Sequence, residues 1–217
     1  MNLLERNNAL LEAAKTGNLS EVQRLVESGA DVNCRGRNGI TPVNQNASMH
    51  LAVKEYLVTH GADLNYTGFA EGTVLMLAAG AGAVDIVQRL IELGAKVNLA
   101  MPNRGETALH QAAQAGQSKT VLVLLAAGAN PNAFTVTGAR TEMSSGPLRG
   151  ETALHFAAAY GDEEMVQGLL AAGGDKTIPD GYGDRPSVYL RRHHRNSPHF
   201  GAMYSLLKSP KRSESNS

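Results

Sequence analysis

The stretch Glu106–Asn132, ETALHQAAQAGQSKTVLVLLAAGANPN, decides the fold of this chain, because most of it recurs at Glu151–Asp175 as ETALHFAAAYGDEEMVQGLLAAGGD. In the second copy Thr152 is suited to cap a helix, and Gly161 and Gly173 are suited to end two helices, since glycine tolerates a left-handed conformation. The apolar residues follow helical spacing: Leu154, Ala157 and Ala158, then Met165, Val166, Leu169 and Leu170. Each copy therefore predicts two short antiparallel helices.

The unit repeats along most of the chain. Its anchoring position is occupied by Thr41, Thr73, Thr107, Thr152 and Arg185, which are 32, 34, 45 and 33 residues apart. Helices this short are marginal alone, because isolated helices need roughly 12–15 residues even in favourable sequences. The pattern therefore predicts an all-α solenoid in which stacked helix pairs stabilise their neighbours.

The two copies resemble ankyrin repeats, with the T-P-L-H-x-A-A start and L-L-x-x-G-A-x-x-N end of that family. The resemblance covers about residues 7–190 and implies about six repeats of antiparallel helix pairs joined by β-turn or hairpin fingers. We expect one domain over residues 1–208, with a degenerate first repeat at Ala9–Asn33, a degenerate C-terminal cap at about 183–208 and a disordered tail at 209–217.

Two regions depart from the family pattern. The second repeat is one residue short around NQNASMHLA, so its first helix is expected to shrink to about a turn. This shortening resembles the second repeat of ankyrin-type inhibitors of cyclin-dependent kinases. The second departure is FTVTGARTEMSSGPLR at Phe134–Arg149. It lies in the 45-residue interval between Thr107 and Thr152, which is 12 residues longer than the usual repeat. We favour an extended finger projecting toward the concave face, and a flexible loop is the alternative.

Composition restricts the possible functions. The net charge is zero, although the chain from Arg185 onward carries +6 and residues 1–184 carry −6. The near-neutral total argues against a general nucleic-acid binder. No apolar run of membrane-spanning length is present, and the lone Cys34 fits a reducing compartment. We expect a cytoplasmic monomer, with a nuclear location or export as a bacterial effector as alternatives.

No residues form a recognisable catalytic or metal-binding pattern. His110 and His155 occupy the histidine position that, by resemblance to the family, bridges the threonine and nearby backbone. The adjacent His193 and His194 point about 100° apart if helical, which is poor geometry for sharing a metal. Cys34 has no evident activating base in the sequence. We therefore predict a protein that is not an enzyme and needs no cofactor or metal.

In a solenoid the core positions are committed to packing, so binding specificity is expected at the fingers and on the inner face of the first helices. The predicted function is protein–protein interaction as a scaffold or adaptor. The alternatives are an inhibitor or regulatory subunit of an enzyme such as a kinase, and a bacterial effector acting on host proteins. The candidate partner-binding residues are Arg37, Met49, Phe69, Arg104, Gln114, Phe134, Arg140, Glu142, Met143, Arg149, Tyr160 and Tyr182.

Overall fold

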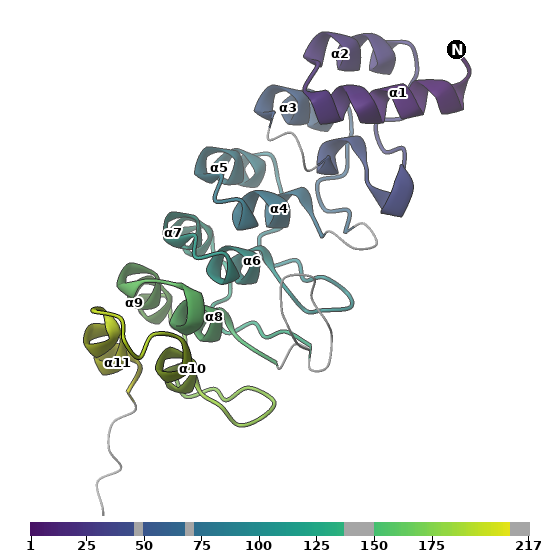
Figure 1. Ribbon diagram of the computed structural model, residues 1–217. Coiled ribbons are helices and arrows are strands. Elements are labelled where there is room, and N and C mark those ends of the chain that lie inside the picture. The colour runs from purple at the N-terminus through teal and green to yellow at the C-terminus, as the bar shows by residue number, and fades with distance from the viewer. Residues whose placement is uncertain (46–49, 68–71, 137–149, 209–217) are drawn as a thin grey trace, which may run out of the picture.

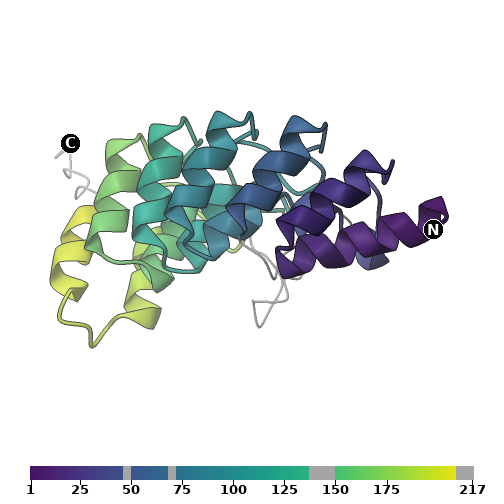
Figure 2. The same ribbon diagram turned by 90° about the horizontal axis from the view of Figure 1, so that it is seen from above.

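A computed structural model describes residues 1–45, 50–67, 72–136 and 150–208. In these ranges the chain forms eleven α-helices and two 3-10 helices, and no β-strand. The elements are α1 (Leu3–Thr16), α2 (Leu19–Glu27), η1 (Arg37–Gly39), η2 (Pro42–Asn44), α3 (Leu51–Thr59), α4 (Val74–Gly80), α5 (Val84–Glu92), α6 (Ala108–Gln114), α7 (Ser118–Ala126), α8 (Ala153–Tyr160), α9 (Glu163–Ala171), α10 (Pro186–His193) and α11 (Phe200–Leu207). Helix pairs follow one another from the N-terminus to α11 (Figures 1 and 2), which confirms the all-α ankyrin-type solenoid.

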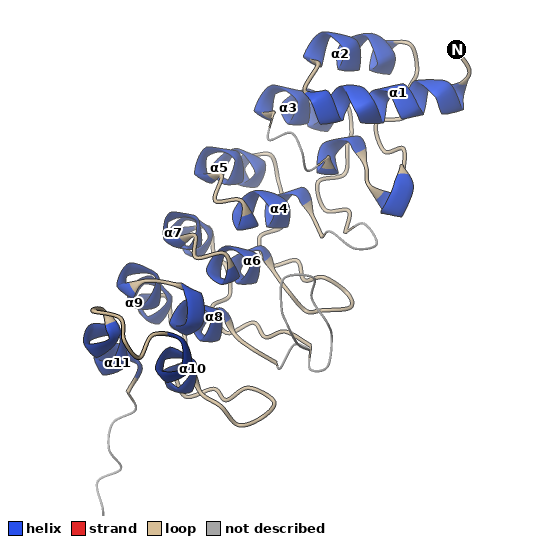
Figure 3. Cartoon of the chain, viewed as in Figure 1, coloured by secondary structure: helices blue, strands red, loops and turns tan. Residues whose placement is uncertain are grey.

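The helices stack in two rows. The inner helices α4, α6, α8 and α10 pack on one another in chain order, and the outer helices α5, α7, α9 and α11 do the same. The loops that precede the inner helices project to one side of the array as fingers (Figure 3). No helix in the described ranges is both long and apolar enough to cross a membrane.

Small residues let neighbouring inner helices approach closely. An alanine pair in the middle of each regular inner helix is fully buried: Ala78 and Ala79, Ala112 and Ala113, Ala157 and Ala158. On the outer helices a valine and a leucine three residues later are also fully buried, as in Val121 and Leu124. These contacts between neighbouring repeats supply the core that no single short pair could form.

Asparagines at the ends of the outer helices tie each repeat to the next. Asn33 Nδ2 donates to the carbonyl oxygen of Gly61 at 2.9 Å, and its Oδ1 accepts from the Asp63 amide at 2.9 Å. Asn98 and Asn132 make the same pair of contacts with the repeats that follow them. The asparagines therefore satisfy turn backbone groups that would otherwise lack protein partners.

The second repeat differs from the others in its first helix. In the described residues this helix is reduced to η2, which confirms the predicted shortening to about a turn. Lys54 on α3 stands three residues before the buried Leu57, where α2, α5, α7 and α9 carry a valine, and it is only 3% exposed. Its Nζ donates to the carbonyl oxygen of Val43 at 2.8 Å. The lysine stem thus fills the valine position, while the amine binds a carbonyl of the shortened helix.

The finger of the fifth repeat is closed at its base by Thr135 and Glu151. The Thr135 amide donates to the Glu151 carbonyl at 3.0 Å, and the Glu151 amide donates to Thr135 Oγ1 at 2.9 Å. In the preceding finger the Met101 amide donates to the Glu106 carbonyl at 2.8 Å. The two fingers therefore share this closure at their base. Residues 137–149, for which we expected an extended finger or a flexible loop, lie outside the described residues.

Candidate functional site

Three predicted partner-binding residues on the last two repeats carry exposed aromatic side chains. Phe134 is 67% exposed at the base of the fifth finger, Tyr182 is 66% exposed in the sixth finger, and Tyr160 is 51% exposed at the end of α8. Arg37 in η1, on the second finger, is also exposed. Exposed aromatic groups of this size supply much of the binding energy at protein interfaces.

Phe134 belongs to a short extended segment that lies against the preceding finger. It forms an antiparallel bridge with Thr152, and the amide of Val136 donates to the carbonyl oxygen of Arg104 at 2.8 Å. Thr135 between them is buried, whereas Val136 is 48% exposed. The alternation places Phe134 and Val136 on the same outer side, as expected for extended backbone. The sequence analysis did not select Val136, although the alternation in AFTVT indicates it.

Tyr160 lies beside the last repeat. Its ring centroid is 5.5 Å from that of His193 on α10, and the planes are tilted by 59°. His194 bridges the same two repeats, because its Nε2 lies 2.9 Å from the carbonyl oxygen of Ala159. Ala159, which supplies this carbonyl, is itself buried. The ends of α8 and α10 therefore present one aromatic pair on the surface.

Arg104 and Gln114 are less accessible than the aromatic residues. The Arg104 side chain is 18% exposed, and its Nε lies 3.2 Å from Glu106 Oε2. Gln114 is half-buried on α6. Glu106 and Glu151, each directly before the capping threonine of its repeat, are both buried.

The remaining predicted binding residues lie outside the described ranges. They are Met49, Phe69, Arg140, Glu142, Met143 and Arg149.

Buried carboxylates connect the last fingers. The hydroxyl of Tyr189 lies 2.9 Å from Glu151 Oε1 and 2.8 Å from Asp180 Oδ2, although it has one proton to donate. Burial and the neighbouring Glu151 carboxylate raise the Tyr189 pKa. Burial also raises the pKa of Glu106, against the effect of nearby Arg104. The fingers are therefore joined by a polar network inside the protein, which sequence spacing did not indicate.

The two histidines of the repeats hold the fingers in place. His110 Nδ1 accepts a hydrogen bond from the Thr107 amide at 3.2 Å, so Nε2 carries the proton and donates to the carbonyl oxygen of Ala133 at 3.0 Å. His155 bridges Thr152 and Asp184 in the same way. Burial lowers the pKa of His110 to about 4 and also lowers that of His155. The bridging expected from the family resemblance is confirmed.

The described residues show no arrangement suited to catalysis or to holding a metal ion. Burial raises the pKa of the Cys34 thiol to about 11, which disfavours the reactive thiolate. No group of three or more histidine, cysteine or acidic side chains in the described ranges could hold a metal.

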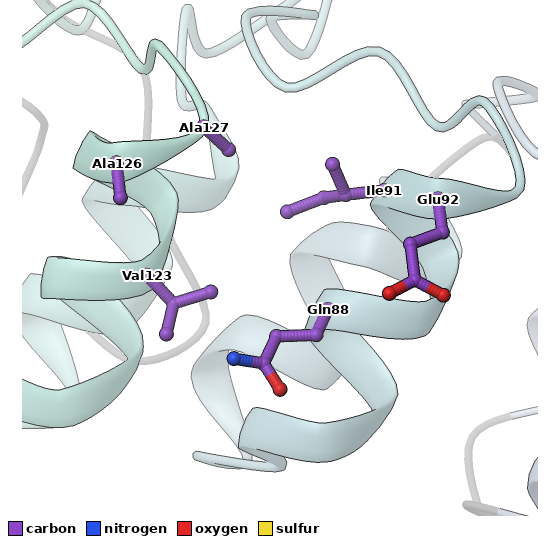
Figure 4. A pocket seen from close by; sticks show the side chains of 6 residues that line it. All are labelled: Gln88, Ile91, Glu92, Val123, Ala126 and Ala127. Carbon is purple, nitrogen blue, oxygen red and sulfur yellow. The ribbon is translucent and has the colours of Figure 1, made fainter.

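A shallow groove of about 400 Å³ lies on the outer face between α5 and α7 (Figure 4). Gln88, Ile91 and Glu92 line one side, and Val123, Ala126 and Ala127 line the other. The groove is mostly apolar, and the Glu92 carboxylate at its side pairs with Arg89 at 2.8 Å.

The stacked helix pairs and exposed fingers define a solenoid protein of the interaction-module class. Sequence comparison agrees: a model of three ankyrin repeats matches residues 52–135, and a single ankyrin-repeat model matches residues 5–37 and 149–181. The chain belongs to the ankyrin-repeat family.

Curated relatives share the repeats within much longer proteins. The chain is 36% identical over 151 residues to the mitochondrial disaggregase of Bos taurus, covering 66% of this chain and 21% of that protein. It is 33% identical over 132 residues to the ankyrin repeat and KH domain-containing protein mask-1 of Caenorhabditis elegans, covering 59% of this chain and 5% of the relative. The human mitochondrial disaggregase is 30% identical over 180 residues, with 66% of this chain and 24% of the relative covered. The chain thus spans less than a quarter of the length of these relatives, and what they share with it is a protein-interaction module.

Proposed function

We propose that this protein is a non-catalytic interaction module that binds another protein through the fingers and inner helices of its fifth and sixth repeats. The observation that carries the proposal is the position of the exposed aromatic side chains. Phe134, Tyr160 and Tyr182 are all more than half exposed and come from these two repeats. Exposed aromatic side chains are frequent anchors of protein–protein interfaces.

The mechanism is rigid presentation. The fingers are closed by backbone hydrogen bonds and joined by buried side chains, so little conformational entropy is lost when a partner binds. Such a surface suits a scaffold or adaptor that acts as a monomer.

A second candidate function is inhibition of an enzyme such as a kinase. One support is the shortened first helix of the second repeat, which resembles that of the ankyrin-type kinase inhibitors. The other is the number of extra residues in the fifth finger, which follow the exposed Val136 and which we propose enter a cleft of the partner. Inhibition of a co-purifying enzyme by the pure chain would favour this candidate. The bacterial-effector alternative depends on the source of the chain.

Affinity capture followed by mass spectrometry tests the proposal. The intact chain is compared with the double variant Tyr160→Ser and Tyr182→Ser, whose sites are exposed and whose melting temperature should stay near that of the wild type. Leu3→Ser and Leu4→Ser, which also replace exposed apolar residues but on α1, form the matched control. The proposal requires a protein recovered with the wild type and the control but lost with the tyrosine variant. Equal recovery with all three forms would contradict it.

A further inference from the structure

The last inner helix differs from the others in charge at the positions that face the concave side. Arg192 and His193 on α10 occupy the places of Ala159 and Tyr160 on α8. Arg191, Arg192 and His193 form the last turn of α10, and Arg195 follows it; all four are exposed. Positive charge is therefore concentrated where the preceding repeat carries neutral side chains.

A polar outer end explains only part of this charge. The end repeat of a solenoid must face water, and the Arg191 guanidinium, 6.0 Å from the ring centroid of Tyr204 on α11, serves that purpose. Arg192 points back toward the sixth finger, where its Nη1 lies 2.7 Å from Asp184 Oδ2. Asp184 is two residues from the exposed Tyr182. Arg192 thus extends the positive region to the aromatic finger.

The exposed residues of these two repeats are named here the C-terminal surface: Tyr160, Tyr182, Arg191, Arg192, His193 and Arg195. The Tyr160–His193 ring contact joins its two repeats, and the Arg192–Asp184 ion pair joins helix to finger. Asp184 offsets the charge of Arg192, and two further acidic groups at the start of α9 accept hydrogen bonds from their own helix. Asp162 caps α9 by accepting from the Met165 amide at 2.8 Å, and Glu163 accepts from Gln167 at 2.9 Å.

We infer that the C-terminal surface binds an extended acidic segment of a protein partner, with an apolar side chain of that segment seated against Tyr160 or Tyr182. This inference rests on the proposed function and names the partner's chemistry. Charge complementarity supports it: residues 185–208 contain five arginine and lysine residues and no aspartate or glutamate. A long polyanion such as nucleic acid fits less well, because residues 1–184 carry −6 and would repel the part of it beyond the patch.

Fluorescence anisotropy with the intact chain tests the inference. The probe is a short labelled peptide of glutamates interrupted by phenylalanines, compared with the same peptide carrying glutamine for every glutamate. The acidic probe should bind at least about tenfold more tightly at low salt, and added salt should reduce the difference. The triple substitution Arg191→Gln, Arg192→Gln and Arg195→Gln should remove at least about tenfold of that affinity.

A matched control removes the same net charge elsewhere. Lys15→Gln, Lys96→Gln and Lys119→Gln change three exposed lysines on other repeats and should leave acidic-probe binding within about twofold of the wild type. Circular dichroism and melting curves check that both triple variants fold.

Equal binding of the two peptides, or equal weakening by the two triple variants, would overturn the inference. So would tighter binding of a short single-stranded DNA than of the acidic probe, or a dimer that the arginine substitutions dissociate. A natural partner captured equally by wild type and arginine variant but lost from the tyrosine variant would also overturn it. In that case the proposed function would stand. If both the arginine variant and the tyrosine variant still captured the partner, the inference and the proposed function would both be contradicted.

Discussion

The second and fifth repeats both depart from the regular pattern, but in opposite directions. The second repeat has a shortened first helix and compensates inside the protein, where Lys54 binds the Val43 carbonyl oxygen. The fifth repeat keeps both helices and differs instead in the number of residues between Thr135 and Glu151 and in its exposed Tyr160. Changes to the second repeat should therefore act mainly on stability, and changes to the fifth mainly on binding.

Placing the second repeat's lysine at the valine position of a regular repeat should have the largest effect on stability. Val121→Lys buries an ammonium beside α6, which is a full helix whose carbonyl groups are used within the helix. The free energy of unfolding should therefore fall by about 4 kcal/mol. Lys54→Val should change the free energy of unfolding by no more than about 1–2 kcal/mol, because the Val43 carbonyl loses its donor while the burial penalty on the ammonium is removed. Urea unfolding measures both changes, and equal losses would show that the second repeat is not specialised.

The second repeat should also respond to alkaline pH. Burial lowers the Lys54 pKa from 10.5 to about 8, so between these values the unfolded chain binds more protons than the folded one. Stability should therefore rise with pH across this window, by on the order of 3 kcal/mol. The Lys54→Met variant should lack the rise in pH-dependent urea unfolding. A rise that persists in the variant would assign it to other groups.

The regular repeats should respond to acid instead. The His110 pKa of about 4 lies below its ordinary 6.5, so stability should fall as pH drops through this window. The loss from His110 is on the order of 3 kcal/mol, and it is complete only below pH 4. Carboxylates titrate there too, so the measurement is the difference in slope between wild type and His110→Gln. Parallel slopes would contradict the assignment.

Shortening the fifth finger should have the smallest effect on stability. Deleting residues 138–148 leaves Val136, Thr137, Arg149 and Gly150 between Thr135 and Glu151, the same length as the Pro102–Gly105 tip of the preceding finger. Because a shorter loop is easier to close, the variant should be more stable by about 1 kcal/mol. A large loss in a thermal melt would show that the extra residues stabilise the fold.

Sequence periodicity was sufficient for the helix pairs and the shortened second repeat, because these depend on local spacing. It also pointed to Phe134, Tyr160 and Tyr182 as exposed. Gly173 takes the expected left-handed conformation after α9, but the expectation was wrong for Gly161, which ends α8 with a φ of −88°. The burial of Glu106 and Glu151 could not be predicted in this way, since it depends on how the fingers cover neighbouring residues far along the chain. Lys54 was missed although a signal was present: it aligns with Val22, Val87, Val121 and Val166, and a charge at a uniformly apolar position indicates a compensating contact.

Hydrogen exchange measured by mass spectrometry, with and without the acidic peptide, tests most directly whether the two departures have separate consequences. The account predicts that α3 exchanges faster than α7 and α9 in both samples, because its partner helix is shortened. It predicts that the peptide slows exchange in α8, α10 and the finger at 180–184, and leaves α3 unchanged. Protection of the second repeat by the peptide, with none in the fifth and sixth repeats, would contradict the central claim.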